Sequence, residues 1–471
     1  MPSPCVIRQL VNCPDLFDLA ERFPKHYPYL LENSGEATDL GRYDILFAFP
    51  AMQLVCRADG SLLLNGKEQA QELFLDQLDS IYKQSKYDAS SFNDESLAND
   101  LPFTGGWFLY LGYELAAEIE PVLQSSLHQP ELPRAIMTEI PAGIVRDKQS
   151  GEDYVFASGE NASELLDKII QDVQLLTDKI RPVQPEGGHP DCNIEEEEGE
   201  RYLSSVEQVK EYIRDGDVFQ VNLSRRWHTD CDTKLPVPDA WRRLRNSNPS
   251  PFAAWARLDE STTLLSSSPE RLLERRRGVV RTRPIAGTYP RSEDQDTDNK
   301  LSAELLLHPK ERAEHIMLVD LERNDLGRIC RPGTIHVGDL MVLETYAHVH
   351  HIVSDVSGEL RAGISPGDII RAVFPGGTIT GCPKVRCMEI IAELEAEARD
   401  AYTGSVGYLC NNGDMDLNIL IRTITHHDDR YIFRAGAGIV ADSDPQRELG
   451  ETRSKALGMY RIFEADYPEY E

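Results

Sequence analysis

The chain has 471 residues, with 49 Lys and Arg against 79 Asp and Glu, and its formal net charge is −30. That balance argues against a nucleic-acid partner, because phosphate backbones reward clustered positive charge. No stretch approaches the roughly 20 apolar residues that span a bilayer, and no basic segment followed by an apolar run opens the sequence, so we expect a cytoplasmic protein without a membrane partner.

The first half of the chain predicts antiparallel β-structure. Between residues 40 and 160, short apolar segments flank turn residues such as Asp59-Gly60 and Ser150-Gly151, a spacing typical of hairpins. We interpret residues 1–180 as a scaffold region. The expected strands are 43–50, 52–57, 61–64, 140–147 and 153–158.

A composition change follows at residues 181–200, where Pro and Gly accompany a run of glutamates, which indicates a linker or surface loop. Residues 201–215 carry apolar side chains at helical spacing and end at Gly216, so they predict an amphipathic helix that leads into a strand over 218–227. We expect the catalytic region to span 201–466.

Near the C-terminus, residues 405–410, 417–425 and 431–442 predict three strands of an antiparallel meander. The chain shows no strand–helix–strand alternation with a GxGxxG turn, so a doubly wound nucleotide-binding fold is not expected. The predicted fold class is α+β, with antiparallel β-sheets packed together and helices on the outside.

Two pairs of glutamates could hold a metal ion. Residues 302–328 predict one helix with Leu305, Met317, Leu318 and Leu321 on its apolar side and Glu311, Glu314 and His315 on the other. Glu448 and Glu451, with Lys455, repeat the i, i+3 spacing on the last long helix. Carboxylates so spaced suit Mg²⁺, although each pair taken alone is more often a solvated helix face.

Other features suggest an anionic ligand. Residues 373–395 form a Gly-rich segment that enters a helix at Pro383, where a small anion or simply a tight turn would fit. Gly436 and Gly438 interrupt a strand at alternate positions, which indicates either a close approach by a ligand or a crowded sheet crossing. Arg422 lies in an apolar strand and needs an anionic partner, which a structural glutamate could also provide.

A local basic cluster, Arg281, Arg283 and Arg291, could attract a multiply charged acid or could be a solvated hairpin. The chain has no GxSxG motif, so a serine hydrolase has little support. From the residues alone, the expectation is a Mg²⁺ site and a small organic anion.

Eight segments resemble, in order, the motifs of the chorismate-utilising enzymes. They run from about residue 200 to 460 and include both glutamate pairs, Arg422 and the Gly436–Gly438 strand. The segments are GDVFQVNLSRR, SSSPERLL, TRPIAGTYPR, PKERAEHIMLVDLERNDLGR, FPGGTITGCPK, MDLNILIRT, AGAGIVADSDP and ELGETRSKAL.

This resemblance implies an anthranilate synthase component I-like fold and a site for Mg²⁺ and chorismate. The metal would join Glu314 and Glu451 to a substrate carboxylate, with Glu311 and Glu448 acting through water. Glu270 would be the general acid for loss of the C4 hydroxyl, beside Gln220 and Lys455. The implied substrate-binding residues are Arg422, Tyr402, Gly436, Ala437, Gly438, Thr378, His351, Ala286 and Thr288.

The residue type at position 220 indicates which nucleophile the enzyme uses. Relatives that add water resemble one another in carrying Lys at this position as a base, and Gln cannot deprotonate water. The resemblance therefore favours ammonia, delivered by a separate glutamine amidotransferase subunit. Asn222 and most other segments resemble the aminodeoxychorismate synthases, which aminate C4. Ala286 in PIAGT instead matches the anthranilate synthases, which aminate C2 and remain the alternative.

Two further expectations follow from the resemblance. The segment YLLENSG is similar to the family's tryptophan-binding element, with Asn33 in place of its Ser and Ser34 next to it, so tryptophan could bind near Leu31–Ser34; packing by Leu30 and Leu31 is the alternative. A non-catalytic binding subunit would lack Glu270 or the metal-site glutamates, and all of these are present.

Overall fold

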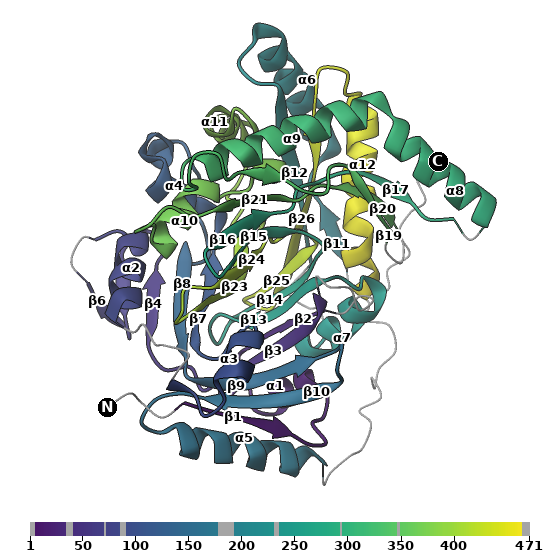
Figure 1. Cartoon of the computed structure of the whole chain (residues 1–471). Coiled ribbons are helices and arrows are strands. Elements are labelled where there is room, and N and C mark those ends of the chain that lie inside the picture. Colours follow the sequence, from purple (N-terminus) through teal and green to yellow (C-terminus); the bar gives the residue numbers. More distant parts are fainter. Residues whose placement is uncertain are drawn as a thin grey trace.

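The computed structural model describes residues 5–33, 41–69, 72–84, 91–177, 193–229, 235–292, 294–345 and 349–463. Within these ranges the chain forms two large antiparallel sheets that pack face to face, with helices on their outer faces (Figure 1). The predicted α+β fold class is therefore confirmed. No helix in these ranges is long and apolar enough to cross a lipid bilayer.

The first sheet has 12 strands in the described ranges and combines both halves of the chain. Strand β2 pairs with β13, for example, so the sheet continues across the predicted domain boundary. Its strands, in spatial order, are β1 (Val6–Leu10), β10 (Glu152–Ala157), β9 (Ala142–Asp147), β3 (Tyr43–Ala48), β2 (Tyr29–Glu32), β13 (Phe252–Arg257), β14 (Thr262–Ser268), β25 (Thr423–His427), β26 (Arg430–Ile439), β12 (Gln220–Thr229) and β11 (Ile194–Glu196), with β22 (Gly381–Cys382) also on β12.

The second sheet has 11 described strands and also mixes the halves, because β7 pairs with β23. In order they are β18 (His336–Val337), β21 (Val356–Glu359), β16 (Val279–Thr282), β15 (Arg271–Arg276), β24 (Met415–Asn418), β23 (Ser405–Cys410), β7 (Gly106–Leu111), β8 (Ala135–Ile140), β4 (Gln53–Cys56), β5 (Leu62–Leu64) and β6 (Lys67–Glu68). A small sheet contains β17 (Ile285–Pro290), β20 (Val349–Val353) and β19 (Val342–Thr345).

Apolar side chains fill three layers. The middle layer lies between the two sheets, where Tyr29 of β2 stacks on Phe108 of β7 with ring centres 3.8 Å apart. Helices α1 (Leu16–Arg22), α5 (Ala162–Thr177), α7 (Val237–Ser247) and α12 (Pro445–Tyr460) cover the first sheet. Helices α2 (Phe74–Gln84), α9 (Pro309–Gly327) and α10 (Pro366–Val373) cover the second.

Near the end of β12, a separate cluster is formed by α6 (Gly199–Asp215) and α11 (Lys384–Leu394), which pack on β12 and β26. Helix α6 confirms the helix predicted over 201–215, and Gly216 ends it with a φ of 85°. The helix predicted to begin at Pro383 is also confirmed, since Pro383 is the N-cap of α11 and Met388, Ile391 and Leu394 are buried. Helix α8 (Gln295–Leu307) extends outward from the body, on the right of Figure 1.

Two sequence predictions were wrong about continuity. The expected strand over 417–425 is two strands, β24 and β25, which belong to different sheets, so the predicted meander is two hairpins joined by a crossing at residues 419–422. The expected helix over 302–328 breaks between α8 and α9, because Pro309 begins a new helix with His308 as its N-cap.

The face of α9 was also partly mispredicted. His315 is fully buried and its Nε2 lies 2.5 Å from the Ser354 hydroxyl, so it lies on the inner face with Leu318 rather than opposite it. The predicted linker ends earlier than expected, since Ile194–Glu196 is a strand paired with β12; residues 181–192 lie outside the described ranges. The division into 1–180, 181–200 and 201–466 remains a prediction about the sequence.

Candidate active site

Two glycines of β26 define where side chains approach the backbone. A Cβ atom on Gly438 would lie 2.4 Å from Nε2 of Gln220, and one on Gly436 would lie 2.8 Å from the Tyr402 hydroxyl and 2.9 Å from Oδ1 of Asn222. Any larger residue would displace these polar groups. The space over the two glycines is therefore occupied by two predicted site residues, Gln220 and Tyr402, by Asn222, and by the Leu223 carbonyl, which lies 2.6 Å from the Gly436 position.

The carboxylates of α9 and α12 reach the same stretch of β26. Gln220 donates from Nε2 to Oε1 of Glu314 at 2.8 Å. On the other helix, Nζ of Lys455 lies 2.7 Å from Oε1 of Glu451 and donates to the carbonyl of Gly436 at 3.1 Å. Glu314 thus lies beside Gly438, and Lys455, the partner of Glu451, lies beside Gly436 two positions away on the same strand.

The donor set can be tested against Mg²⁺. Within the described residues, no three His, Cys, Asp or Glu side chains converge as a metal-binding group. Mg²⁺, however, takes one or two protein carboxylates and keeps water and substrate oxygens as its other ligands. The buried Oε1 of Gln220 has no hydrogen-bond partner and is a further oxygen donor beside Glu314. The residues present therefore fit a two-carboxylate Mg²⁺ site.

Glu311 and Glu448 lie at the margins of this arrangement. Oε2 of Glu311 is 3.0 Å from the position of a Cβ on Gly287, so this carboxylate packs against β17. Glu448 is buried on α12, and its charge together with that of Glu451 contributes to raising the pKa of Tyr202, after the larger effect of burial. Their predicted action through water remains a prediction.

Glu270 follows β14 and is 5 % exposed, and its Oε1 has no hydrogen-bond partner. Burial raises its pKa to about 7, against the opposing effects of the Thr378 hydroxyl, the backbone of Ile285, Lys455 and Arg422. A carboxyl with this pKa is substantially protonated near neutral pH, which a general acid requires.

Arg422 does not lie within a strand, contrary to the prediction. It sits at the crossing between β24 and β25 with a φ of 50°, and its carbonyl accepts a hydrogen bond from the Ser267 N–H at 3.0 Å. Burial lowers the pKa of its guanidinium and Glu270 acts in the opposite direction, so the two side chains are neighbours. Which anion pairs with Arg422 remains a prediction.

His351 of β20 is a buried, uncharged side chain of the site. It is 2 % exposed, and burial followed by the charge of Arg422 lowers its pKa to about 3, with a smaller effect from Lys455. Beside it, β17 pairs with β20 so that Ala286 lies opposite Ile352 and Thr288 opposite His351. Ala286 is buried; the side chain of Thr288 lies outside what the structure describes.

The structure thus brings most of the predicted residues into one neighbourhood, since each member contacts or electrostatically influences another. Three elements far apart in the sequence meet there: β12, the Glu270 loop and α12. The members are Gln220, Asn222, Glu270, Glu314, His351, Thr378, Tyr402, Arg422, Gly436, Gly438, Glu451 and Lys455. Ala437 lies between the two glycines with its side chain buried.

The predicted basic cluster does not form one patch. Arg283 pairs with Glu344, and Arg291 pairs with Asp298 at 2.9 Å. Arg281 is exposed on β16, whereas Arg283 lies in the connection between β16 and β17. Two of the three charges are therefore neutralised locally, and the cluster does not present a joint anion site.

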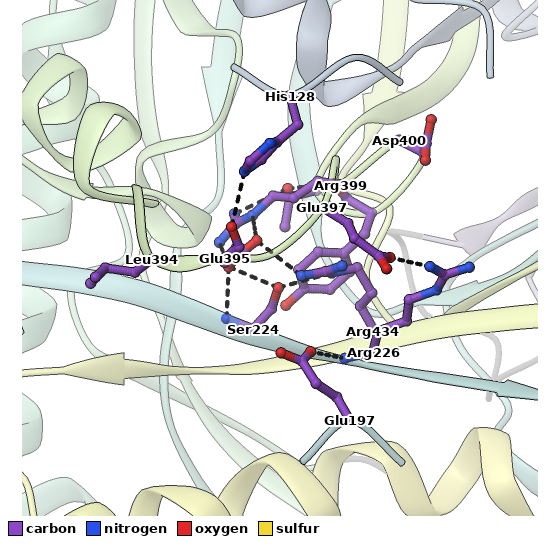
Figure 2. Close-up of polar contacts among 12 residues, drawn as sticks. His128, Glu197, Ser224, Arg226, Leu394, Glu395, Glu397, Arg399, Asp400 and Arg434 are labelled. Atoms are coloured by element: carbon purple, nitrogen blue, oxygen red, sulfur yellow. Dashed lines mark hydrogen bonds and ion pairs between the residues drawn. The ribbon is translucent and has the colours of Figure 1, made fainter. Parts of the chain in front are cut away.

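A buried charge network adjoins the site, and sequence reasoning missed it (Figure 2). Glu395 accepts hydrogen bonds from the Ser224 N–H at 2.8 Å, from Arg399 at 2.6 Å and from Arg434 at 3.1 Å. Burial acts to raise the pKa of Glu395, but the two guanidinium groups outweigh it and hold that pKa below its ordinary value.

Arg399 connects this network to the active site. It donates to the carbonyl of Asn222 at 2.7 Å and lies 5.5 Å from the centre of the Tyr402 ring. The network borders a surface pocket of about 320 Å³, which Tyr402 also lines. The one signal in the sequence was the i, i+4 pair Glu395 and Arg399, which in the acidic segment 393–400 looks like a solvated helix surface.

The region predicted to bind tryptophan has its own pocket. Leu31 and Glu32 line a pocket of about 590 Å³ together with Phe252, Arg271 and Tyr408. Asn33 is buried and its N–H donates to Asp44 at 2.8 Å, whereas Ser34 lies outside the described residues. Tryptophan binding remains a prediction.

Comparison with known proteins identifies the family of the chain. The family model described as "chorismate binding enzyme" matches residues 29–461. Aminodeoxychorismate synthase component 1 of Bacillus subtilis is 41% identical over 377 residues, covering 78% of each chain. Anthranilate synthase component 1 of Aquifex aeolicus is 37% identical over 450 residues, covering 92% of this chain and 89% of its own.

A solved structure, anthranilate synthase component I from Streptococcus pneumoniae, superposes with a TM-score of 0.77 at 32% identity and covers 90% of this chain and 93% of its own. The fold, the assembled site and the match over nearly the whole sequence agree. The chain therefore belongs to the chorismate binding enzyme family.

Proposed function

We propose that this enzyme aminates chorismate at C4, giving 4-amino-4-deoxychorismate for p-aminobenzoate and folate synthesis, in the cytoplasm. The main support for this proposal is the residue at position 220, Gln220. It is 3 % exposed and its amide is bonded to Glu314, in the position where water-adding relatives resemble one another in carrying a basic Lys. An amide cannot take a proton from water, so ammonia is the better nucleophile here.

The site residues suggest how the substrate is held. Chorismate is a dianion, and Arg422 and Lys455 are two cations whose charges act on Glu270 and lower its pKa. When bound, Mg²⁺ would neutralise a substrate carboxylate and orient the ring from Glu314 and Glu451. Backbone groups at Gly436 and Gly438 allow the ligand to approach β26 closely. These contacts would fix the ring for reaction.

Glu270 supplies the chemical step. Its protonated carboxyl donates to the departing C4 hydroxyl, which leaves as water, while ammonia adds to the ring and releases a proton. The neutral imidazole of His351 and the buried wall around it limit the water that could compete with ammonia. We infer that a separate glutamine amidotransferase subunit provides the ammonia.

Anthranilate synthesis, with ammonia added at C2, is the second candidate. Ala286 favours it, because this buried residue belongs to the PIAGT form that resembles the anthranilate synthases. The names of similar proteins include both activities. The resemblance of GDVFQVNL and of most other segments to the aminodeoxychorismate synthases supports C4 amination as the first candidate.

One assay separates the candidates. Purified protein is incubated with chorismate, Mg²⁺ and an ammonium salt, and products are followed by chromatography and fluorescence. We expect p-aminobenzoate only after aminodeoxychorismate lyase is added. Anthranilate appearing without the lyase would replace the C4 assignment, and no consumption of chorismate would contradict the whole proposal.

A further inference from the structure

Two side-chain oxygen atoms of the active site lie over Gly436. Oδ1 of Asn222 is buried and has no hydrogen-bond partner among the described residues. It lies 2.9 Å from the position of a Cβ on Gly436, and the Tyr402 hydroxyl lies 2.8 Å from the same position. The separation of the two oxygens cannot exceed the sum of these distances, about 5.7 Å, so one small donor between them can reach both at ordinary N–H···O lengths of about 2.9 Å.

The neighbours of Asn222 fix its position and the orientation of its amide. Its N–H donates to the carbonyl of Thr380 at 3.0 Å, and its carbonyl accepts from Arg399 at 2.7 Å. The side-chain Nδ2 donates to the carbonyl of Thr378 at 3.5 Å. Because a carbonyl only accepts, the amide nitrogen faces Thr378 and the amide oxygen faces Gly436. Oδ1 is therefore held in place as an acceptor.

The Tyr402 hydroxyl is the second oxygen of this pair. The side chain is 8 % exposed, and burial raises its pKa to about 12, so the group keeps its proton at neutral pH. A hydroxyl donates one hydrogen bond and accepts others. It can therefore donate to a carboxylate of chorismate, as the family resemblance implies for Tyr402, and still accept a hydrogen bond from a second ligand.

A buried acceptor without a partner calls for a ligand that donates. Such an oxygen has lost its water, and only a donor restores the lost hydrogen bond. The carboxylates and the ether oxygen of chorismate accept hydrogen bonds and donate none. Its C4 hydroxyl does donate, but in the proposed reaction this group departs with a proton from Glu270. Ammonia, the other reactant, carries three N–H donors and a lone pair.

We propose that Asn222 and Tyr402 form the subsite that binds ammonia. Two of its N–H groups donate to Oδ1 of Asn222 and to the Tyr402 hydroxyl, which leaves the nitrogen lone pair available to attack the ring. The bond that forms and the hydroxyl that leaves are those of the proposed reaction, so the subsite contributes position and no further chemical step. This inference rests on the proposed amination of chorismate, and not on which carbon is aminated.

The test measures steady-state kinetics with chorismate, Mg²⁺ and an ammonium salt at one fixed pH. Asn222→Leu keeps the approximate size of the side chain and removes the acceptor, so we expect KM for ammonia to rise about tenfold while KM for chorismate stays within about twofold of the parent value. Asn222→Asp keeps an oxygen but loses the N–H that donates to Thr378. We expect its KM for ammonia to be no higher than that of the parent. Asn299→Leu, at an exposed position of α8, is the matched control.

Three results would overturn the inference. An unchanged KM for ammonia in Asn222→Leu would mean that the oxygen does not bind ammonia. An equal rise in KM for chorismate would assign the missing donor to chorismate. An equal rise of KM for ammonia in Asn222→Asp would mean that Asn222 acts through Thr378. A partly folded variant cannot imitate the expected result, because it lowers the amount of active enzyme without changing KM.

Tyr402→Phe provides a second measurement, which also decides the question if Asn222→Leu does not fold. It removes the other oxygen and should raise KM for ammonia, and an unchanged value would contradict the subsite. Failure of the proposed function gives a different result. A parent enzyme that consumes no chorismate with the ammonium salt would remove both proposals, whereas normal consumption by the parent, with KM for ammonia unchanged in the variants, would remove only the subsite.

Discussion

One face of β12 carries two polar regions that differ in how their groups are paired. Gln220 and Asn222 face the active site, and Ser224, two positions on, belongs to the Glu395 network. In the network, Glu395 is bonded to Ser224 and to both Arg399 and Arg434. In the active site, Oε1 of Gln220, Oδ1 of Asn222 and Oε1 of Glu270 are buried and have no hydrogen-bond partner among the described residues.

We expect the Glu395 network to stabilise the fold and the active-site cluster to serve ligand binding and catalysis. Buried polar groups are normally hydrogen-bonded, because an unpaired one loses its water without compensation. A paired network therefore adds rigidity, whereas a cluster of unpaired atoms is a place prepared for a ligand. Changes in the first region should act on stability, and changes in the second on catalysis.

The largest expected effect is Glu270→Gln. Loss of the general acid should lower kcat by about 10²- to 10⁴-fold, because proton transfer to the leaving hydroxyl is lost. The free energy of unfolding should stay the same or increase, since a neutral amide replaces a buried carboxyl. Steady-state kinetics and urea unfolding check both halves. Glu260→Gln, at an exposed loop position, is the control, and retained activity in Glu270→Gln would assign the acid elsewhere.

Next in size is Glu395→Gln, which should lower the free energy of unfolding by about 3–5 kcal/mol by leaving two buried guanidinium groups without their anion. Urea unfolding is the measurement. Glu397→Gln, two residues on, breaks only the partly exposed pair with Arg226 and should change stability by less than about 1 kcal/mol. If the two variants unfold alike, the buried network is not the stabilising element we describe.

The sequence predicted the fold better than it predicted the active site and the Glu395 network. Alternating apolar residues and turn signals were enough for the hairpins β4–β5 and β9–β10. They could not show that residues 419–422 cross between sheets, because a continuous apolar run looks the same in one strand or two. The network was missed for a similar reason: an acidic helix end gives no sign that Glu395 is buried.

The site depended on resemblance more than on spacing. Glu314 and Glu451 each belong to an i, i+3 pair of glutamates, a pattern that is common on solvated helices. Only the family motifs joined the two pairs into one site. The structure added the partners, namely Gln220 for Glu314 and Lys455 for Glu451. The contact between Gln220 and Glu314 joins residues 94 positions apart, which no local pattern encodes, whereas Lys455 and Glu451 are an i, i+4 pair on one helix.

A smaller effect is expected from Glu314→Gln, which tests the proposed metal site. We expect the Mg²⁺ concentration for half-maximal activity to rise by about 10- to 100-fold, with little change in unfolding free energy. Calorimetric titration with Mg²⁺ provides a readout independent of turnover. Asp320→Asn on the outer face of α9 is the control, and an unchanged Mg²⁺ affinity in Glu314→Gln would remove this residue from the site.

The smallest effect concerns pH and stability. The pKa of Glu270 is about 7 in the folded protein, above its ordinary value of 4.5. Between these values the folded state keeps a proton that the unfolded state loses, so stability falls as pH rises from about 4.5 to 7 and then levels off. Glu270→Gln should lack this contribution, and its stability relative to the parent should grow over that interval. Urea unfolding at about pH 5 and pH 8 measures the difference. If the difference in unfolding free energy between Glu270→Gln and the parent is the same at both pH values, Glu270 keeps an ordinary pKa. It would then be ionised at neutral pH and could not act as the general acid.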